Sequence, residues 1–371
     1  MHYRRFGRTE LLLSRFSLGT MRCLSSAKVF YQTVSQAVEL GINHLETAPS
    51  YGQSEEYLGL AFQRGLSRSN LHITTKILPT TDPQQVWQTL QTSRQRLQTD
   101  YIDCVAIHGI NTAEHLDWAI DHCVPVLQEA IDQGWIGHIG FSTHGSLDLV
   151  TAAINTGLFS FVNLHYYYFF QRLAPAIALA QAQDMGIFII SPADKGGQLF
   201  TPSAKLQELC QPFSPLELTY RWLLSDQRVT TLSLGAAHPA ELTAPLASDQ
   251  SATLTAAEIT VIGHLEEELH DQLGADLCSQ CYACLPCPVD INIPEILRLR
   301  NLDVAYEMKS YGQYRYRMLE NAGHWFPGTK GSRCNDCGDC LPRCPQQLKI
   351  PELLRDTDQR LRTSEGRRLW D

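Results

Sequence analysis

Two short cysteine-rich stretches, CSQCYACLPCP at residues 278–288 and CNDCGDCLPRCP at residues 334–345, lie toward the C-terminus of the 371-residue chain. In each stretch three cysteines follow one another with two residues between them, and a fourth cysteine precedes a proline. Three thiols at this spacing can wrap one iron–sulfur cluster, and a fourth thiol followed by proline reaches the other cluster in two-cluster ferredoxins. The second stretch matches the bacterial C-x2-C-x2-C-x3-C-P signature in full, whereas the first has one residue fewer before its last cysteine. Together the stretches predict two iron–sulfur sites.

Zinc sites and disulfides are the other interpretations of these stretches. Zinc sites rarely place three thiols at successive two-residue intervals followed by Cys-Pro. Disulfides are disfavoured because the start of the sequence, MHYRRFGRTELLL, has no apolar run long enough for a signal peptide, and thiols stay reduced in the cytosol. The remaining cysteines are expected to be small buried apolar residues: Cys23, Cys104, Cys123 and Cys210.

Composition restricts the partners and suggests two domains. The length suits a large domain of roughly 250 residues and a smaller one. The net charge is −9, and residues 1–268 carry 16 basic and 25 acidic residues, whereas residues 269–371 carry 14 of each. No basic stripe indicates a nucleic-acid partner, and no stretch approaches the ~18 apolar residues of a membrane span. We therefore expect a cytoplasmic protein with a first domain over residues 1–268 and a second over residues 269–371.

Short apolar, β-rich runs alternate with amphipathic stretches in the first domain. Eight strands, each followed by a helix, in about 240 residues are typical of a parallel (β/α)8 barrel. A doubly wound open sheet is the alternative, but it usually requires Gly-x-Gly-x-x-Gly after its first strand, which residues 18–23 lack. We therefore expect an α/β protein, a TIM barrel followed by a small α-helical domain. The expected strands are Leu13–Thr20, Ile42–Ala48, Leu71–Ile77, Tyr101–His108, Ile136–Thr143, Phe161–Tyr168, Gly186–Pro192 and Thr230–Ala236.

Polar side chains gather at the ends of three consecutive expected strands. Glu46 and Tyr51 follow the second strand, Lys76 ends the third and His108 ends the fourth. In a barrel the chemistry lies at the C-terminal ends of the strands. A tyrosine, with an ordinary pKa of about 10, can protonate a developing alkoxide, and a neighbouring lysine lowers that pKa. We expect Glu46 to hold Lys76 in place and His108 to orient a substrate carbonyl.

At these four positions, called the catalytic group below, the chain resembles the aldo/keto reductases. The family is a (β/α)8 barrel that passes a hydride from NADPH to an aldehyde or ketone. The resemblance implies that its catalytic tetrad falls on Glu46, Tyr51, Lys76 and His108, with Glu46 standing where the family has aspartate. The resemblance covers residues 3–268 and rests on RRFGRT (4–9), GINHLETA (41–48), YG (51–52), TTK (74–76), DYID (100–103), IGFS (139–142) and ISP (190–192).

The resemblance also implies a nicotinamide cofactor site after the later strands. Ile190 stands where the family has a tyrosine that stacks on the nicotinamide, and residues 235–245 contain no arginine or lysine for the 2′-phosphate of NADPH. The choice among NADPH, NADH and a flavin therefore stays open. The residues expected to contact the cofactor are Ser142, Thr143 and Asn163 at the nicotinamide and Ser191, Lys195, Gly196 and Gly235 at the phosphates.

The tail resembles a ferredoxin-type extension found in one branch of the same family, which carries the same short first cysteine run. This implies an α-helical module with two [4Fe–4S] clusters and helices at Pro294–Leu302 and Val304–Glu320. The cross-over of the fourth cysteine assigns the ligands of the two clusters. One cluster takes Cys278, Cys281, Cys284 and Cys344, and the other takes Cys334, Cys337, Cys340 and Cys287.

Three functions are consistent with these features. The first is a reductase of a small-molecule carbonyl substrate whose clusters are structural or exchange electrons with a ferredoxin-like carrier. The second is an electron-transfer protein whose barrel holds a flavin or another organic group, because a cluster accepts single electrons whereas nicotinamide gives two as hydride. The third is a non-enzymatic redox sensor. Retention of Tyr51, Lys76 and His108 together favours the first.

Overall fold

The computed structural model describes residues 1–193, 198–249 and 253–364. The chain divides into two compact units, residues 1–195 with 219–253 (the barrel unit) and residues 196–218 with 254–371 (the cysteine unit). Helix α11 (Ala256–Leu273), which contains the expected boundary at residue 268, belongs to the cysteine unit. Compactness alone does not test independent folding, so the division into domains of residues 1–268 and 269–371 stays a prediction. Among the described residues, no helix has both the length and the apolar character to cross a membrane.

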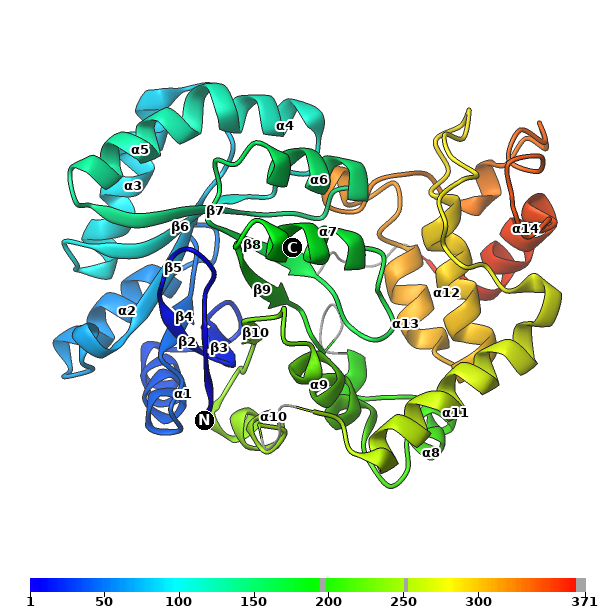
Figure 1. The fold of residues 1–371 in the computed structure, drawn as a ribbon, viewed down its shortest axis with the longest axis horizontal. Coiled ribbons are helices and arrows are strands. Elements are labelled where there is room, and N and C mark those ends of the chain that lie inside the picture. Colours follow the sequence, from blue (N-terminus) through cyan, green and yellow to red (C-terminus); the bar gives the residue numbers. More distant parts are fainter. Residues whose placement is uncertain (194–197, 250–252, 365–371) are drawn as a thin grey trace. The chain divides into compact units, whose positions relative to one another are not determined.

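Eight parallel strands close into a barrel in the order β10-β3-β4-β5-β6-β7-β8-β9, which confirms the expected (β/α)8 fold. The connecting helices form a layer outside the strands (Figure 1). The strands are β3 (Phe16–Gly19), β4 (His44–Glu46), β5 (His72–Ile77), β6 (Ile102–His108), β7 (Ile136–Ser142), β8 (Phe161–His165), β9 (Gly186–Ile190) and β10 (Thr231–Leu234). The helices are α1 (Ala27–Glu39), α2 (Ser54–Gln63), α3 (Pro83–Leu97), α4 (Ala113–Trp118), α5 (Val124–Asp132), α6 (Leu147–Asn155), α7 (Ala174–Ala182), α9 (Pro215–Ser225) and α10 (Thr243–Leu246).

Local sequence fixes where several of these helices begin. Asp82 accepts the backbone N–H of Gln84 ahead of α3, and Pro83 occupies the first helical position, where its missing N–H costs nothing. Ser146 caps α6 in the same way through the N–H of Leu149. These caps end the preceding loops at defined residues and so set the rim on which the site is built.

An N-terminal hairpin of β1 (Tyr3–Arg5) and β2 (Leu12–Ser14) precedes the barrel, and Phe6 between them is fully buried. The Phe6 ring lies 5.2 Å from the ring of Phe161, the first residue of β8. A Cβ added at Gly186, the first residue of β9, would lie 2.3 Å from the Phe6 ring, so only glycine fits there. Phe6 therefore packs beneath the N-terminal ends of β8 and β9, at the end of the barrel opposite the catalytic group.

A buried polar layer crosses the barrel interior at His44. Its Nδ1 lies 2.6 Å from the Ser17 hydroxyl and its Nε2 lies 2.7 Å from the Thr74 hydroxyl. Burial lowers the pKa of His44 to about 3, so the ring is neutral and each nitrogen has a hydroxyl partner. The layer links β3, β4 and β5 by side-chain hydrogen bonds inside the barrel.

The cysteine unit is helical apart from the loops that carry the cysteines. The Tyr306 hydroxyl donates to the carbonyl of Leu265, 2.7 Å away, and ties α12 to α11. The expected helix over residues 304–320 is wrong, because Glu307 adopts a left-handed conformation (φ 54°) that ends α12, and a new helix starts at Lys309. The unit's helices are α8 (Ala204–Leu209), α11, α12 (Ile293–Tyr306), α13 (Lys309–Tyr316) and α14 (Ile350–Leu361).

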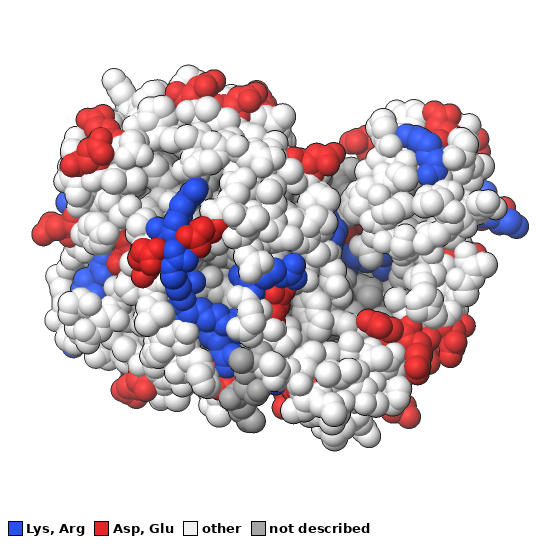
Figure 2. All heavy atoms as spheres, viewed as in Figure 1, with Lys and Arg blue, Asp and Glu red and all other residues white. Residues whose placement is uncertain are grey.

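Acidic and basic side chains are intermixed on the face of the molecule shown in Figure 2. Many of them pair: Arg5 contacts both Glu10 and Asp184 at the surface of the barrel unit. Such pairs neutralise individual charges at the surface and leave the net charge of −9 unchanged.

Candidate active site and cysteine-lined sites

The catalytic group is brought together by the ends of three neighbouring strands. Glu46 is the last residue of β4, Lys76 lies one residue before the end of β5, and His108 is the last residue of β6. Tyr51 lies in the loop between β4 and α2. Because β4, β5 and β6 are adjacent and parallel, their C-terminal ends deliver these side chains to one part of the rim.

Lys76 is the centre of the group. Its ammonium donates to the Tyr51 hydroxyl at 3.0 Å and to the carbonyl oxygen of Thr47 at 2.9 Å, and it forms an ion pair with Glu46. Lys76 and Glu46 are buried, with 2% and 4% of their surfaces exposed. The three donor hydrogens of the ammonium therefore have three acceptors, which offsets the cost of burying the charge. The expected support of Lys76 by Glu46 is present in this geometry.

Tyr51 carries a proton in this environment. Burial, followed by the negative charge of Glu46, raises the pKa of Tyr51 to about 12, and Lys76 only partly opposes this rise. Lys76 lowers the pKa of Tyr51 as expected, but burial and the charge of Glu46 outweigh this effect, so the net pKa is raised rather than lowered. Burial alone would lower the pKa of Lys76, but Glu46 and Tyr51 together raise it.

His108 lies against the tyrosine ring. The two ring centroids are 5.9 Å apart and the rings meet edge to face at 85°. The His108 ring is half-buried, as is Tyr51, so both side chains are accessible from the rim. A carbonyl oxygen that reaches the Tyr51 hydroxyl would also meet the imidazole of His108.

The residues expected at the nicotinamide divide into two kinds. The Ser142 hydroxyl accepts the N–H of Gly109 at 3.0 Å, and the Thr143 hydroxyl accepts the N–H of Gly145 at 2.9 Å, so both already hold neighbouring loops. Asn163 on β8 is fully buried, and neither its amide nitrogen nor its amide oxygen has a partner among the described residues. A buried amide without partners is costly. Of the three residues, only Asn163 therefore has both its donor and its acceptor available to a bound carboxamide.

The expected phosphate contacts follow the last two strands of the barrel. Ser191 comes directly after β9 and has a left-handed backbone (φ 54°), and Gly235 comes directly after β10 and is exposed. Lys195 and Gly196 lie outside the described residues. The Gly235 carbonyl accepts a hydrogen bond from Arg22, which lies in the loop after β3.

Sequence reasoning missed two polar features of this rim. Arg22 follows the first barrel strand, whereas the predicted catalytic group comes from the ends of the second, third and fourth strands. A histidine pair was also missed: the Nε2 atoms of His144, after β7, and His165, at the end of β8, are 3.3 Å apart. Position at a strand end was the available signal in both cases.

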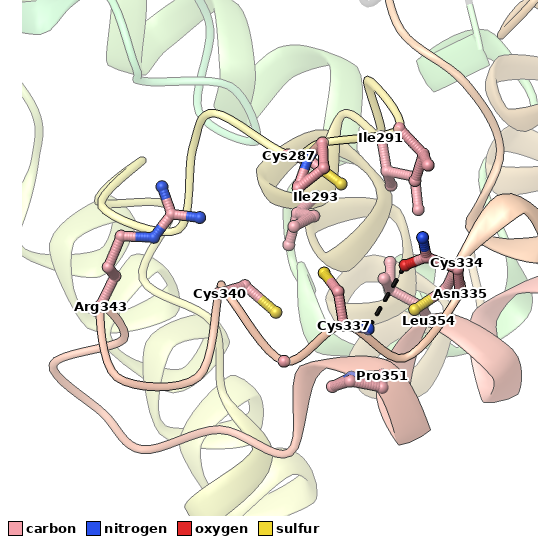
Figure 3. A pocket seen from close by; sticks show the side chains of 13 residues that line it. Cys287, Ile291, Ile293, Cys334, Asn335, Cys337, Cys340, Arg343, Pro351 and Leu354 are labelled. Carbon is pink, nitrogen blue, oxygen red and sulfur yellow. Dashed lines mark hydrogen bonds between the residues drawn. The ribbon is translucent and has the colours of Figure 1, made fainter.

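The eight cysteines of the two runs surround two hollows in the cysteine unit. The first hollow, of about 280 Å³, is lined by Cys278, Cys281, Cys284 and Cys344 together with apolar side chains such as Leu297. The second hollow, of about 320 Å³, is lined by Cys287, Cys334, Cys337 and Cys340, whose sulfur atoms face a common space in Figure 3. The structure thus groups the cysteines as the cross-over of the fourth ligand predicts. In the part of the chain that the structure describes, no three His, Cys, Asp or Glu side chains converge as closely as a single metal ion requires.

The two runs share a local backbone conformation. Gln280 and Asp336, each directly before the second cysteine of its run, have left-handed backbones with φ of 58°, and Tyr282 and Gly338, directly after it, are also left-handed. The N–H of Gln280 lies 3.4 Å from the sulfur of Cys278. Hydrogen bonds to sulfur stabilise thiolates and tune a bound cluster.

Burial of the thiols makes a positive partner necessary for their ionisation. Burial, followed by the neighbouring Cys278 thiol, raises the pKa of Cys284 to about 12. Burial also raises the pKa of Cys278, to about 11. Four thiolates can share one hollow only if bound metal neutralises them. The all-sulfur donor set and the apolar walls both fit an iron–sulfur cluster.

Comparisons with known proteins find one family that matches the barrel and one that matches the cysteine-rich part of the chain. The model of the aldo/keto reductase family matches residues 15–267, and the model of a 4Fe-4S dicluster domain matches residues 277–348. YrpG of Bacillus subtilis, an uncharacterized oxidoreductase, is 28% identical over 225 residues, which are 54% of this chain and 68% of that protein. The methylglyoxal reductase DkgB of Escherichia coli O157:H7 is 32% identical over 134 residues, which are 36% of this chain and 48% of that protein.

Solved structures share the barrel. The holo form of the aldo-keto reductase AKR11C1 from Bacillus halodurans superposes with a TM-score of 0.63 over 71% of this chain and 95% of that chain, at 22% identity. At this identity the likeness shows the fold. The family model covers most of the chain and includes all four positions of the catalytic group. The chain therefore belongs to the aldo/keto reductase family, and it is an oxidoreductase with a C-terminal 4Fe-4S dicluster domain.

Proposed function

We propose that the barrel reduces the carbonyl group of a small aldehyde or ketone, with a nicotinamide dinucleotide as the hydride source and Tyr51 as the proton donor. The observation that carries the proposal is the 3.0 Å hydrogen bond between Lys76 and the Tyr51 hydroxyl beside the buried carboxylate of Glu46. When bound, the reduced nicotinamide supplies two electrons and a hydrogen nucleus to the carbonyl carbon. Tyr51 gives its proton to the carbonyl oxygen, the product is an alcohol, and solvent reprotonates the tyrosinate.

Each member of the catalytic group has a role in the proton transfer. Tyr51 is protonated at neutral pH because its pKa is raised to about 12, so it meets the substrate as an acid. Lys76 lies within hydrogen-bond distance of the tyrosinate that forms and stabilises it by charge. Glu46 keeps Lys76 positioned, and His108 orients the carbonyl oxygen against Tyr51.

Asn163 supports the nicotinamide part of the proposal. Its amide nitrogen and oxygen are buried and unpartnered among the described residues, and a carboxamide offers the complementary acceptor and donor. Ser142 and Thr143 would support the nicotinamide site indirectly, by holding the neighbouring loops in place. Ile190 would make an apolar contact with the nicotinamide where the family has a stacking tyrosine. Ser191, Lys195, Gly196 and Gly235 remain the proposed phosphate contacts.

Two [4Fe–4S] clusters in the cysteine unit form the second part of the proposal. Cys281 and Cys337 are exposed, whereas Cys284 and Cys340 are buried, so each cluster would approach the surface at the middle of its run. Exposure of the second cysteine of each run, Cys281 or Cys337, favours electron exchange with a ferredoxin-like carrier over a purely structural role. The clusters would be held by the four cysteines that line each hollow.

The test compares Tyr51→Phe with Tyr57→Phe in anaerobically purified protein with full iron content. Methylglyoxal is the first substrate to try, because relatives such as DkgB are named for it, within a panel of aldehydes and ketones. Tyr51→Phe and Lys76→Met should each lower turnover by roughly 10²–10⁴-fold, the usual range for general acid catalysis. Tyr57 on α2 is the matched control, because its hydroxyl donates to the side chain of Gln53, directly before α2, and its loss should leave turnover unchanged.

The visible spectrum separates this proposal from the flavin alternative. Broad absorbance that reductant bleaches indicates clusters, whereas resolved flavin bands would transfer the electron chemistry to another group in the barrel. A protein that contains iron but binds neither NADPH nor NADH, with electron transfer indifferent to Tyr51→Phe, would contradict the reductase.

A further inference from the structure

We propose that the barrel selects NADH over NADPH and that Glu241 is the residue that decides this choice. The inference rests on the proposed function, because it concerns the dinucleotide that serves the catalytic group. It depends on the arrangement of Glu241, Arg22, His238 and the backbone of residues 235–237 in the loop after β10.

The location follows from the barrel itself. In barrels of this kind the loops after the seventh and eighth strands, with the start of a short extra helix, frequently form the phosphate site. Here those strands are β9 and β10, and a short helical turn, Pro239–Leu242, follows Gly235. A dinucleotide whose carboxamide lies at Asn163 on β8 would extend past β9 to this loop, because β8, β9 and β10 are neighbours.

A carboxylate occupies this loop and is held there from three sides. Glu241 accepts the backbone N–H of Ala237 at 2.9 Å. Arg22 contacts it at 3.2 Å and His238 at 3.4 Å. The Glu241 side chain is 25% exposed, so it faces the solvent side of the loop but cannot leave without breaking these contacts.

Arg22 does not supply the free cation that a 2′-phosphate needs. Its guanidinium donates to the Gly235 carbonyl at 2.6 Å and pairs with Glu241, so its charge is compensated within the loop. A 2′-phosphate carries almost two negative charges at neutral pH, as other phosphate monoesters do. A 2′-phosphate placed at this loop would lie at least as close to the carboxylate of Glu241 as to the guanidinium of Arg22.

The 2′-hydroxyl of NADH suits the same place. In doubly wound dinucleotide-binding folds an acidic residue accepts the ribose 2′-hydroxyl of NAD, whereas an arginine accommodates the 2′-phosphate of NADP, and the same chemistry applies to a carboxylate in a barrel loop. A carboxylate has about four acceptor positions, and the N–H of Ala237 occupies one of them, while Arg22 and His238 lie within ion-pair distance. The Glu241 carboxylate can therefore still accept a hydroxyl donor, whereas its negative charge disfavours a second anion.

The experiment measures the dissociation constants of NADH and NADPH by fluorescence titration of the full-length, iron-loaded protein. We expect wild type to bind NADH about 10–100-fold more tightly. Glu241→Gln keeps the shape and removes the charge, so it should reduce this ratio at least about fivefold, chiefly by improving NADPH binding. Glu241→Arg should reverse the preference. Glu39→Gln, which removes an exposed carboxylate at the end of α1, is the matched control and should leave both constants unchanged.

Arg22→Ala distinguishes the two roles open to that arginine. If Arg22 compensates Glu241, its loss should weaken NADPH binding further and widen the preference for NADH. Wild type that binds NADPH as tightly as NADH, or more tightly, would overturn the inference and leave the reductase proposal standing. Failure of both dinucleotides to bind would overturn the reductase proposal and this inference with it. Circular dichroism and iron content verify that each variant is folded.

Discussion

The catalytic group and the two cysteine-lined hollows are assembled in different ways. The catalytic side chains come from β4, β5, β6 and a loop, and they meet because the strands of a closed barrel end at one rim. Each hollow takes three of its cysteines from one run, residues 278–284 or 334–340, and only the fourth from the other run. The first site depends on the whole barrel, whereas the second depends mainly on local spacing.

The two sites also differ in what they need from a ligand. Lys76 has three acceptors within the protein, so its buried charge is satisfied by neighbouring residues. The buried thiols of the cysteine unit have raised pKa values, so their ionised form requires bound metal. We therefore expect metal binding to contribute to the folding free energy of that unit and not to that of the barrel.

Iron removal should therefore affect the two units very differently. Structural metal sites contribute on the order of 10 kcal/mol to folding, so chelation under reducing conditions should abolish protection from amide exchange in α12, α13 and α14. Exchange in β5, β6 and β7 should stay slow, and these strands provide the internal control in the same sample. Equal loss of protection in both units would show that the barrel depends on the clusters too.

Substitution of a fourth cysteine should damage the distant site. We expect close to eight iron atoms per chain in wild type, as for two four-iron clusters, and about half as many in Cys344→Ser. The signal that disappears should belong to the cluster of Cys278, Cys281 and Cys284. Cys287→Ser is the matched variant and should remove the other cluster. Loss of the cluster nearest in sequence in either variant would mean that the fourth cysteines do not cross over.

The pH profile of carbonyl reduction tests the environment of Tyr51. Burial and Glu46 raise its pKa to about 12, so the acid form persists as the pH rises and is lost only through that value. The ratio kcat/KM, which reports the free enzyme, should stay constant within about twofold from pH 6 to about 10. A tenfold fall per pH unit that begins near pH 8 would show that Lys76 outweighs burial and Glu46.

Glu46→Asp should have the smallest effect. The shorter side chain is the one that the resemblance leads us to expect at this position, and Lys76 retains the Thr47 carbonyl as a second acceptor. Turnover should stay within about tenfold of wild type, equivalent to about 1.4 kcal/mol. Glu46→Gln is the comparison, because it keeps the length and removes the charge. A larger loss for aspartate than for glutamine would mean that reach matters more than charge.

Periodicity and spacing in the sequence were sufficient to predict the barrel strands, the catalytic group and the grouping of the cysteines. All eight barrel strands lie where apolar runs predicted them, and Glu46, Tyr51, Lys76 and His108 converge because strand ends share one rim. The grouping of Cys287 with the second run and Cys344 with the first followed from the Cys-Pro signature.

Features set by tertiary contacts were not predictable. The raised pKa of Tyr51 depends on desolvation of its hydroxyl group and on the charge of Glu46, which together outweigh the charge of Lys76. The pairing of Arg22 with Glu241 joins the first and last strands of the barrel, which are neighbours only after closure. The break at Glu307 depends on a left-handed residue that helix propensity does not reveal.

The shared backbone of the two cysteine runs has a consequence for symmetry. Each run has left-handed residues on both sides of its second cysteine, and each lends its last cysteine to the hollow of the other. The same reciprocity holds in a dimer with a twofold axis, in which each partner makes the same contacts with the other. Within one chain, it means that neither half of the module contains a complete site. The module is therefore comparable to a dimer whose two partners are joined in one chain.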